Sequence, residues 1–275
     1  MSKKWLIGLL ALTCAFTAQA DARLVVAGGS LTELIYALGA GNRVVGVDET
    51  TSFPPETASL PHIGYWKQLN SEGILSLRPD SVFTWQDAGP QIVIDQLRAR
   101  KVNVVTLPRV PSTLDQMYAN IRELAQRLDV PERGEALVTE IEQRLTRVSQ
   151  RAAEKGAPVK ALFILSPGGG APQVAGKGSV ADGILTLAGA QNVATHAQYK
   201  AWSAESLIAA NPEVIVVTTQ MVNGDLQRLS AIAGITHTRA WKNQRIVTVD
   251  QALILGMGPR VADAVDILHQ QFWPH

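Results

Sequence analysis

The sequence is nearly free of cysteine. Its 275 residues include one, Cys14, which lies in an apolar segment at the N-terminus. If that segment is an export signal that is removed, the mature chain has no thiol, and disulfide bonds, thiolate metal sites and thiol catalysis are excluded. A lipid anchor on Cys14 is disfavoured because Thr13 stands where a small residue usually precedes a lipidated cysteine, but this alternative stays open.

An excess of charge of either sign is also lacking. The chain has 25 Lys and Arg residues against 24 Asp and Glu residues, and loss of Lys3 and Lys4 with the N-terminal segment leaves 23 against 24. This balance gives no electrostatic reason to expect a nucleic-acid partner. An apolar content of 46% with 18% charged residues is typical of a globular protein.

The common catalytic loops are missing from the sequence. Residues 25–34 suggest a strand, Gly-Gly-Ser and a helix, but they lack the third glycine of a dinucleotide fingerprint and the Gly-Lys-Ser/Thr of a phosphate loop. No Gly-x-Ser-x-Gly nucleophile elbow occurs, and none of the five histidines forms an i, i+4 pair typical of a helical zinc site. We therefore expect a protein that is not an enzyme, with a secreted hydrolase as an alternative.

The N-terminus carries an export pattern. Lys3 and Lys4 precede an apolar run from Trp5 to Phe16, and Ala18-Gln19-Ala20 follows as a small-x-small cleavage site. This order is typical of a secretory signal peptide, and the run is too short to favour a retained membrane helix. Residues 1–20 are predicted to be removed, so that the mature chain begins at Asp21.

Short buried strands alternate with helices in the first half of the chain. The apolar run at 24–27 ends in glycines, and Ser30 with Glu33 three residues later predicts a helix start with a capping box. The same patterns predict strands at 44–47, 81–85 and 102–107 and helices at 71–77, 90–100 and 113–128. Such alternation implies parallel strands, so residues 21–130 are expected to form an α/β lobe.

A long amphipathic helix is predicted after this lobe. Apolar residues recur at spacings of 3 and 4, at Val138, Ile141, Leu145, Val148 and Ala152. A helix of about 24 residues within the segment 131–156 would reach about 36 Å, which is long enough to bridge two lobes.

The rest of the chain, residues 157–275, predicts a second lobe of the same kind. Strands are expected at 159–165, 214–218 and 245–249, with helices at 179–188, 203–209 and 261–270. The predicted fold class is α/β, with two Rossmann-like lobes joined by a single long helix.

This organisation resembles the rigid-hinge class of periplasmic substrate-binding proteins, which serve importers of vitamin B12, siderophores and haem. The most specific matching segments lie at 60–80, 166–170, 202–217 and 256–260. Within that class, Gly-Tyr-x-Lys at 64–67 and the triple glycine at 168–170 resemble the haem-transport branch. The resemblance implies a periplasmic carrier that delivers ferric haem to an inner-membrane ABC importer, with a siderophore or cobalamin carrier of the same fold as the alternative.

The resemblance also implies that Tyr65 holds the haem iron. Phenolate is a hard oxygen donor suited to ferric iron, and tyrosine is a known axial haem ligand. A free phenol titrates near pH ~10, so binding as phenolate is helped by the metal and by a nearby cation. Lys67 is the first candidate because residues two apart in an extended loop face the same side. The resemblance offers Arg228 as a second candidate.

Two further features bear on how the ligand would be held. Gly168, Gly169 and Gly170 lack side chains, so their backbone can approach a flat macrocycle or offer amides to a propionate; a flexible turn is the alternative. Pro167 stands where some haem-transport relatives have a histidine, which argues against Tyr/His ligation and against two stacked haems.

Other aromatic and histidine side chains are weaker candidates. His62 and His196 are the histidines most able to supply a sixth ligand, although a surface or loop role is the alternative for both. Three tryptophans can either face a porphyrin or fill a core: Trp66, Trp85 and Trp202. Tyr65 is therefore expected to be the sole protein ligand.

Glu72 and Glu205 each lie in the first turn of a predicted helix, one in each lobe. Such glutamates ordinarily favour the positive end of the helix dipole. The resemblance implies that both also pair with arginines on the two permease subunits. The expected partners are haem, a dimeric permease with its ATPase and an outer-membrane haem receptor upstream, and the carrier itself is expected to be a monomer.

Overall fold

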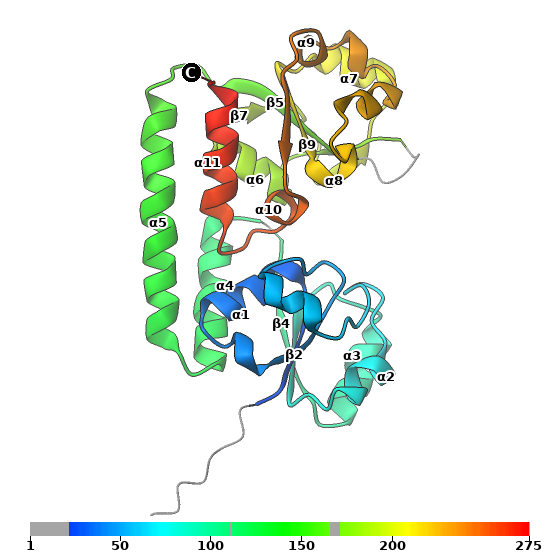
Figure 1. Ribbon diagram of the computed structural model, residues 1–275, viewed down its shortest axis with the longest axis vertical. Helices are drawn as coiled ribbons and strands as arrows, with labels where there is room; N and C mark the ends of the chain where they lie inside the picture. Colours follow the sequence, from blue (N-terminus) through cyan, green and yellow to red (C-terminus); the bar gives the residue numbers. More distant parts are fainter. Residues whose placement is uncertain (1–21, 111, 166–170, 275) are drawn as a thin grey trace, which may run out of the picture.

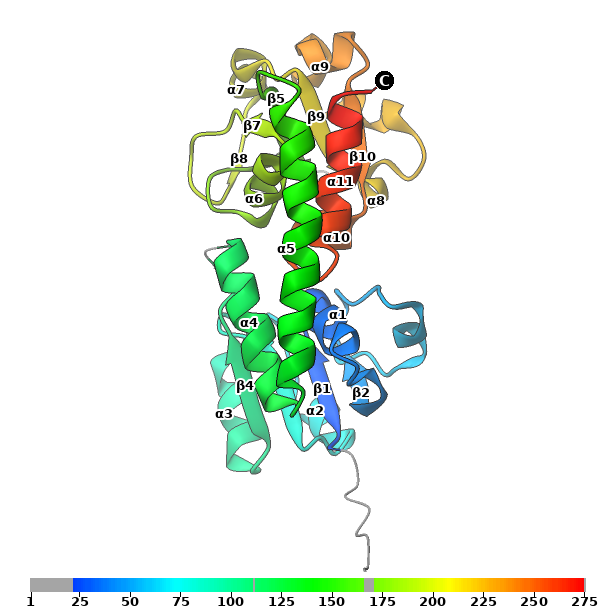
Figure 2. The same cartoon turned by 90° about the vertical axis from the view of Figure 1, so that its left-hand side faces the viewer.

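Two α/β lobes and one long helix beside them make up the protein. The computed structural model describes residues 22–110, 112–165 and 171–274. The lobes lie one above the other, and the long helix runs along one side of both (Figures 1 and 2). The predicted fold class is thus confirmed. No helix in the described ranges is both long and apolar enough to cross a membrane.

The N-terminal lobe is built on a parallel sheet. Its strands have the order β2-β1-β3-β4 and are β1 (Leu24–Ala27), β2 (Val44–Val47), β3 (Ser81–Trp85) and β4 (Asn103–Leu107). The helices are α1 (Gly29–Ala37), α2 (Ser71–Ser76), α3 (Gln91–Ala99) and α4 (Leu114–Arg127). Because the strands are parallel, their carboxyl ends meet at one edge of the sheet, where ligands usually bind in such folds.

The C-terminal lobe has a mixed sheet in the order β10-β9-β5-β6-β8, with β7 paired to β5. Its strands are β5 (Val159–Leu165), β6 (Gln173–Ala175), β7 (Ala190–Asn192), β8 (Tyr199–Ala201), β9 (Val214–Thr218) and β10 (Ile246–Val249). Strands β7, β5, β9 and β10 pair in parallel, whereas β6 runs antiparallel to both β5 and β8. The antiparallel ribbon of β6 and β8 was not predicted.

Helices cover this second sheet and connect its strands. They are α6 (Val180–Leu187), α7 (Ala204–Ala210), α8 (Thr219–Val222), α9 (Arg239–Lys242), α10 (Gln251–Leu255) and α11 (Val261–Phe272). Short 3₁₀ helices lie at Gly41–Arg43 and Pro55–Ser59 in the first lobe and at Leu226–Ala231 and Ile235–His237 in the second.

The spanning helix is α5 (Pro131–Ala153). Its predicted apolar face is buried at Val138, Ile141, Leu145 and Val148. It packs on α4 in the first lobe and on α11 in the second (Figure 2). Both lobes therefore pack on the same helix, which limits how far one lobe can rotate relative to the other.

One predicted interaction, the capping box of Ser30 and Glu33, is wrong. Helix α1 begins one residue earlier, at Gly29, and has no side-chain cap from Ser30. Its first amide, that of Gly29, donates a hydrogen bond to Thr50 Oγ1 at 2.9 Å. Glu33 is instead 6% exposed and accepts hydrogen bonds from Arg260 Nε at 2.8 Å and Nη2 at 2.5 Å. This glutamate links the two lobes.

Candidate functional site

A cleft of about 710 Å³ lies between the lobes. The N-terminal lobe lines it with side chains from the loops after its strands and from the start of α4, and the C-terminal lobe with β6, β8 and α10. Apolar side chains on its walls include Trp85, Leu165, Val180, Leu255 and Met257. The size is in the ordinary range for small-molecule sites.

Tyr65 lies on the wall of this cleft, in the long loop that follows β2. The loop is tied to the end of β2, because the Ile63 amide donates to the Val47 carbonyl at 2.9 Å and the Glu49 amide to the Gly64 carbonyl at 3.0 Å. Gly64 has φ +87°, a left-handed conformation that favours glycine. The next residue, Trp66, is buried, while Tyr65 keeps 36% of its surface exposed. A buried neighbour and an anchored loop thus hold the phenol in the cleft.

Two cations lie by the indole of Trp66, and one carboxylate pairs with both of them. Lys67 Nζ lies 4.9 Å from the ring centroid and Arg109 Cζ 5.3 Å from it. Asp87 Oδ2 pairs with both cations, at 2.9 Å from Arg109 Nη2 and 3.7 Å from Lys67 Nζ. The ring of Tyr65 packs edge-on against the same indole, with centroids 5.5 Å apart. These three side chains together carry one positive charge, and the Asp48 carboxylate also acts on the phenol.

Burial and charge act on the ionisable groups of this wall in different directions. Burial raises the pKa of Tyr65; the charge of Arg109 lowers this pKa, while Asp48 and Asp87 raise it. Burial also opposes ionisation of Asp87, yet its hydrogen bond and charge pairing with Arg109 hold its pKa below the usual value. Tyr65 is therefore a neutral phenol near pH 7 unless a metal ion takes the place of its proton.

The opposite wall carries a second tyrosine. Tyr199 begins β8 and lines the cleft, and burial raises its pKa well above the ordinary value. Strand β8 pairs with β6 from Gln173↔Ala201 to Ala175↔Tyr199. No charged side chain is present among the described residues of the C-terminal lobe that line the cleft.

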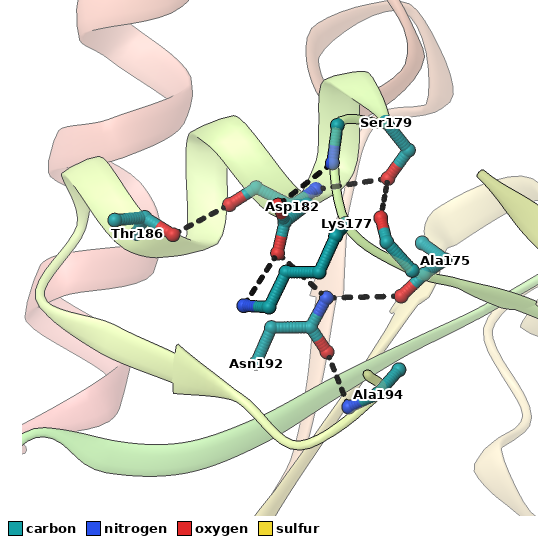
Figure 3. A network of polar contacts seen from close by, with 9 residues as sticks. Ala175, Lys177, Ser179, Asp182, Thr186, Asn192 and Ala194 are labelled. Carbon is teal, nitrogen blue, oxygen red and sulfur yellow. Dashed lines mark hydrogen bonds and ion pairs between the residues drawn. The ribbon is translucent and has the colours of Figure 1, made fainter. Parts of the chain in front are cut away.

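A polar network behind this wall fixes the ribbon of β6 and β8 (Figure 3). Asn192 Nδ2 donates to Asp182 Oδ1 at 2.8 Å and to the Ala175 carbonyl at 3.0 Å. Asp182 Oδ2 accepts from the Gly178 amide, and Lys177 Nζ lies 3.3 Å from Asp182 Oδ1. The network joins the start of α6 to the end of β6. Because β6 pairs with β8, it also stabilises the position of Tyr199.

The structure separates the predicted site residues into groups. Tyr65, Lys67, Trp66 and Trp85 line the cleft. Arg228 lies on an exposed 3₁₀ helix and is not among the cleft residues. Pro167 and the triple glycine at 168–170 lie outside the described residues.

The two histidine candidates do not line the cleft. His62 is exposed and pairs with Val47 in an isolated β-bridge. Both ring nitrogens of His196 are engaged, since Nε2 lies 3.1 Å from the Val174 carbonyl and Nδ1 accepts from Trp202 Nε1 at 3.3 Å. Within the described ranges, no cluster of three or more His, Cys, Asp or Glu side chains is placed to hold a metal ion.

Sequence reasoning missed Arg109 and Asp87. Both lie two residues beyond Leu107 and Trp85, which are paired in the register of β3 and β4. Parallel register therefore brings the two side chains together, and their charges make them an ion pair. The detectable signal was opposite charges at equivalent positions after two neighbouring strands.

Two α/β lobes, a spanning helix and a cleft between them define a two-lobe binding protein. The chain belongs to the periplasmic binding protein family, whose model matches residues 24–253. This is a family of carriers that bind a substrate.

Solved structures and curated proteins give two different ligands for its relatives. The chain is similar to the periplasmic haem-binding protein RhuT from Roseiflexus sp. RS-1 in its apo form, with 37% identity, 92% of this chain and 98% of that chain covered, and a TM-score of 0.87. It is also similar to a periplasmic haem-binding protein from Pseudomonas aeruginosa, with 36% identity, 92% and 93% covered, and a TM-score of 0.87. A vitamin B12-binding protein of Pectobacterium atrosepticum is 28% identical over 267 residues, covering 94% of this chain and 90% of the relative.

Proposed function

We propose that this protein binds ferric haem in the interlobe cleft, with the Tyr65 phenolate on the iron, and delivers it to an inner-membrane ABC importer. The observation that carries the proposal is the Tyr65 phenol, held on the cleft wall beside the net positive cluster of Lys67, Asp87 and Arg109. The haem-binding proteins to which the chain is similar support the same ligand.

The chemistry of the walls suits haem. A porphyrin ring is flat and apolar, and the apolar side chains of the cleft can cover it. Its propionates are anionic, and Lys67 and Arg109 offer charged donors on the same wall as the iron ligand. The metal would supply most of the driving force for ionising Tyr65, because a bound cation strongly favours the deprotonated form of its ligand.

Cobalamin is the second candidate, because curated relatives of the chain are vitamin B12-binding proteins. One feature of the cleft favours it. The polar side chains of the C-terminal wall are mostly amides, at Gln173, Gln198, Gln220 and Gln251, and these suit a ligand whose rim carries amides. The charged N-terminal wall with its phenol favours haem, and the glutamines of the C-terminal wall are compatible with haem as well as with cobalamin. A siderophore carrier is the remaining alternative.

The place of action follows from the same proposal. Residues 1–20 would direct export and be cleaved, leaving the carrier in the periplasm. Haem would reach it after entry through an outer-membrane receptor. Glu72 and Glu205 are exposed, and the capping roles beside them are filled by Asn70 and Ser203, whose side chains accept from the helix amides. The Glu205 carboxylate also accepts hydrogen bonds from its own backbone amide and from Ser203, which lower its pKa. Both carboxylates are exposed, as contact with a dimeric permease would require.

The decisive experiment is a titration of ferric haem into purified wild-type, Tyr65→Ala and Tyr65→Phe protein, followed by the Soret shift and the phenolate charge-transfer band. Loss of a first ligand should cost at least about 100-fold in affinity, since partners of metal ligands alone contribute about 10- to 100-fold. Tyr36→Phe is the matched control, because Tyr36 lies on α1 and not in the cleft lining.

Two outcomes would reject the haem proposal. An unchanged affinity and an unchanged charge-transfer band in both Tyr65 variants would show that the phenol is not the ligand. Cobalamin binding by wild-type protein together with no Soret shift on adding haem would favour the second candidate.

A further inference from the structure

Gln198 lines the cleft in the loop that leads into β8, directly before Tyr199. Its backbone has φ +54°, the left-handed conformation that glycine adopts freely and that is strained for most other residues. Among the described residues that line the cleft, no other non-glycine residue has a positive φ. A glutamine side chain is therefore kept at the cleft wall at a conformational cost that glycine would avoid.

The surrounding loop holds this residue in one conformation. The Gln198 carbonyl accepts a hydrogen bond from the Gly176 amide at 2.7 Å, and the Gln198 amide donates to the Lys177 carbonyl at 3.0 Å. The two segments lie so close that a Cβ at Gly176 would be 2.8 Å from the Gln198 carbonyl oxygen. Such an approach requires glycine at position 176, and it fixes the backbone of Gln198 on both sides.

The side-chain amide of Gln198 is held in place but only partly used. Its Nε2 donates to the Gly178 carbonyl at 3.1 Å. A primary amide has two N–H donors and an oxygen acceptor, so one donor and the oxygen stay open to the cleft within the described structure. Gln220 on the same wall is the opposite case, since Nε2 donates to Asp250 at 2.8 Å and Oε1 accepts from the Gln251 amide at 3.0 Å. Gln220 thus stabilises the fold, whereas Gln198 keeps hydrogen-bonding capacity for a ligand.

The position of Gln198 relates it to the charged wall. Arg109 lines the cleft from the other lobe, and its charge acts on the adjoining phenol of Tyr199. A ligand group that pairs with Arg109 would therefore lie near this part of the C-terminal wall. Because the described cleft residues of that wall carry no charge, a neutral amide donor is what the wall can offer to an anionic group.

We propose that Gln198 is a ligand-binding residue whose open N–H donates to an oxygen acceptor on the rim of the ligand, which in haem is a propionate. The identity of that oxygen rests on the proposed haem-carrier function, since the same donor would bind an amide oxygen on the rim of cobalamin. The strained backbone presents to the ligand a side chain that glycine could not supply.

The first test is a titration of ferric haem into wild-type and Gln198→Gly protein, followed by the Soret shift. Glycine suits φ +54°, so the variant should keep or raise the wild-type denaturant midpoint. Its haem affinity should fall by about tenfold, the lower end for a hydrogen bond to a charged group. Gln244→Gly is the matched control, because Gln244 has φ +55°, is exposed and is not among the cleft residues. It should bind haem as wild type does.

The dimethyl ester of ferric haem separates a ligand contact from a general change in the wall. Esterification removes the propionate charges, so Gln198→Gly should lose clearly less affinity for the ester than for haem. The phenolate charge-transfer band should persist in this variant, because Tyr65 is unchanged. Wild-type haem affinity in Gln198→Gly, an equal loss in Gln244→Gly, or equal fold losses for haem and its ester would overturn the inference.

Failure of the proposed function gives a different result. Absence of a Soret shift in wild type would reject haem as the ligand, and the same three proteins are then titrated with cobalamin. A loss of affinity in Gln198→Gly but not in Gln244→Gly would retain Gln198 as the donor to a rim amide oxygen. Equal cobalamin affinities of all three proteins would overturn the inference.

Discussion

The two walls of the cleft differ in chemistry although both lobes are α/β. The N-terminal wall carries the charged side chains Glu49, Lys67 and Arg109 together with Tyr65. The described part of the C-terminal wall is uncharged, and its polar groups are glutamines and Tyr199. We infer a division of work in which one wall binds the metal and balances charge, while the other covers the ligand.

The origin of this difference is the way each lobe builds its wall. In the N-terminal lobe, loops leave the carboxyl ends of parallel strands and place Tyr65, Asp87 and Arg109 at one edge. In the C-terminal lobe, the antiparallel ribbon of β6 and β8 forms the wall, and the charged side chains Lys177 and Asp182 are paired with each other behind it. Charged side chains are paired in both lobes, but Lys67 and Arg109 line the cleft whereas Lys177 and Asp182 do not.

At the proposed docking surface the two lobes are alike, which gives the prediction with the largest effect. Glu72 starts α2 and Glu205 starts α7, and both helices lie on the side of the molecule away from α5 (Figure 1). Charge reversal of both, Glu72→Lys with Glu205→Lys, should abolish haem uptake in the organism that encodes the protein. Haem affinity of the purified variant should equal that of wild type.

A matched control is available for that experiment. Glu132 is also an exposed glutamate in a first helical turn, but it lies on α5. Glu132→Lys should leave uptake unchanged. Normal uptake by the double variant, or equal loss with Glu132→Lys, would show that the likeness of the two lobes does not extend to docking.

The next prediction concerns the ion pair that joins the two lobes. Glu33 on α1 and Arg260 before α11 form an ion pair between the lobes, and Arg260 Cζ also lies 4.0 Å from the Phe53 ring centroid. Burial raises the pKa of Glu33, and the hydrogen bond and charge of Arg260 oppose that rise. Glu33→Gln leaves the guanidinium charge without its partner and should lower the free energy of unfolding by about 1–3 kcal/mol, less than for a fully buried pair because the Arg260 side chain is 23% exposed.

Denaturant unfolding of ligand-free protein measures this effect. Glu135→Gln is the control, because Glu135 pairs with Arg122 on the exposed surface, where ion pairs contribute little. The control should unfold close to the wild-type midpoint. A Glu33→Gln midpoint that coincides with the control would mean that the ion pair contributes little beyond α5 and the close packing of Ser30 near Gly256 and Gly258.

Much of this fold was predictable from the sequence, because short apolar, β-branched runs bounded by turn residues favour buried strands. Strands β2, β3, β5 and β9 begin and end where the pattern predicted. The three-residue strands β6, β7 and β8 were not predicted. Their sequences, Gln-Val-Ala, Ala-Gln-Asn and Tyr-Lys-Ala, are too short and too polar to show a periodic pattern.

The candidate site was predictable only in its local part. The loop after β2 places Tyr65 and Lys67 together on the cleft wall, as their spacing indicates. Arg109 lies 42 positions after Lys67 in the numbering and joins it only through strand register and Asp87. Glu33 was misassigned for a similar reason, since its partner Arg260 belongs to the other lobe. Contacts between residues far apart in the sequence cannot be predicted from local patterns, because they depend on how the chain folds.

The smallest predicted effect tests the asymmetry of the walls directly. Tyr199→Phe removes one phenol from the C-terminal wall, and Tyr65→Phe removes one from the wall for which we propose metal binding. Because burial raises the pKa of Tyr199 so strongly, this phenol stays protonated and can donate a hydrogen bond to the ligand without ligating iron as phenolate. Loss of one such bond costs about 0.5–1.5 kcal/mol, so haem affinity should fall by at most about tenfold.

Parallel haem titrations of the two Phe variants decide the matter. The charge-transfer band should persist in Tyr199→Phe and vanish in Tyr65→Phe. If instead both variants lost the band and affinity to the same extent, each wall would supply a phenolate, and the uncharged C-terminal wall would have to stabilise its own anion without a cation among its described cleft residues. Tyr199 is 37% exposed, but desolvation at the cleft wall still raises its pKa and opposes a phenolate there, which is why we expect the effect of Tyr199 to be small.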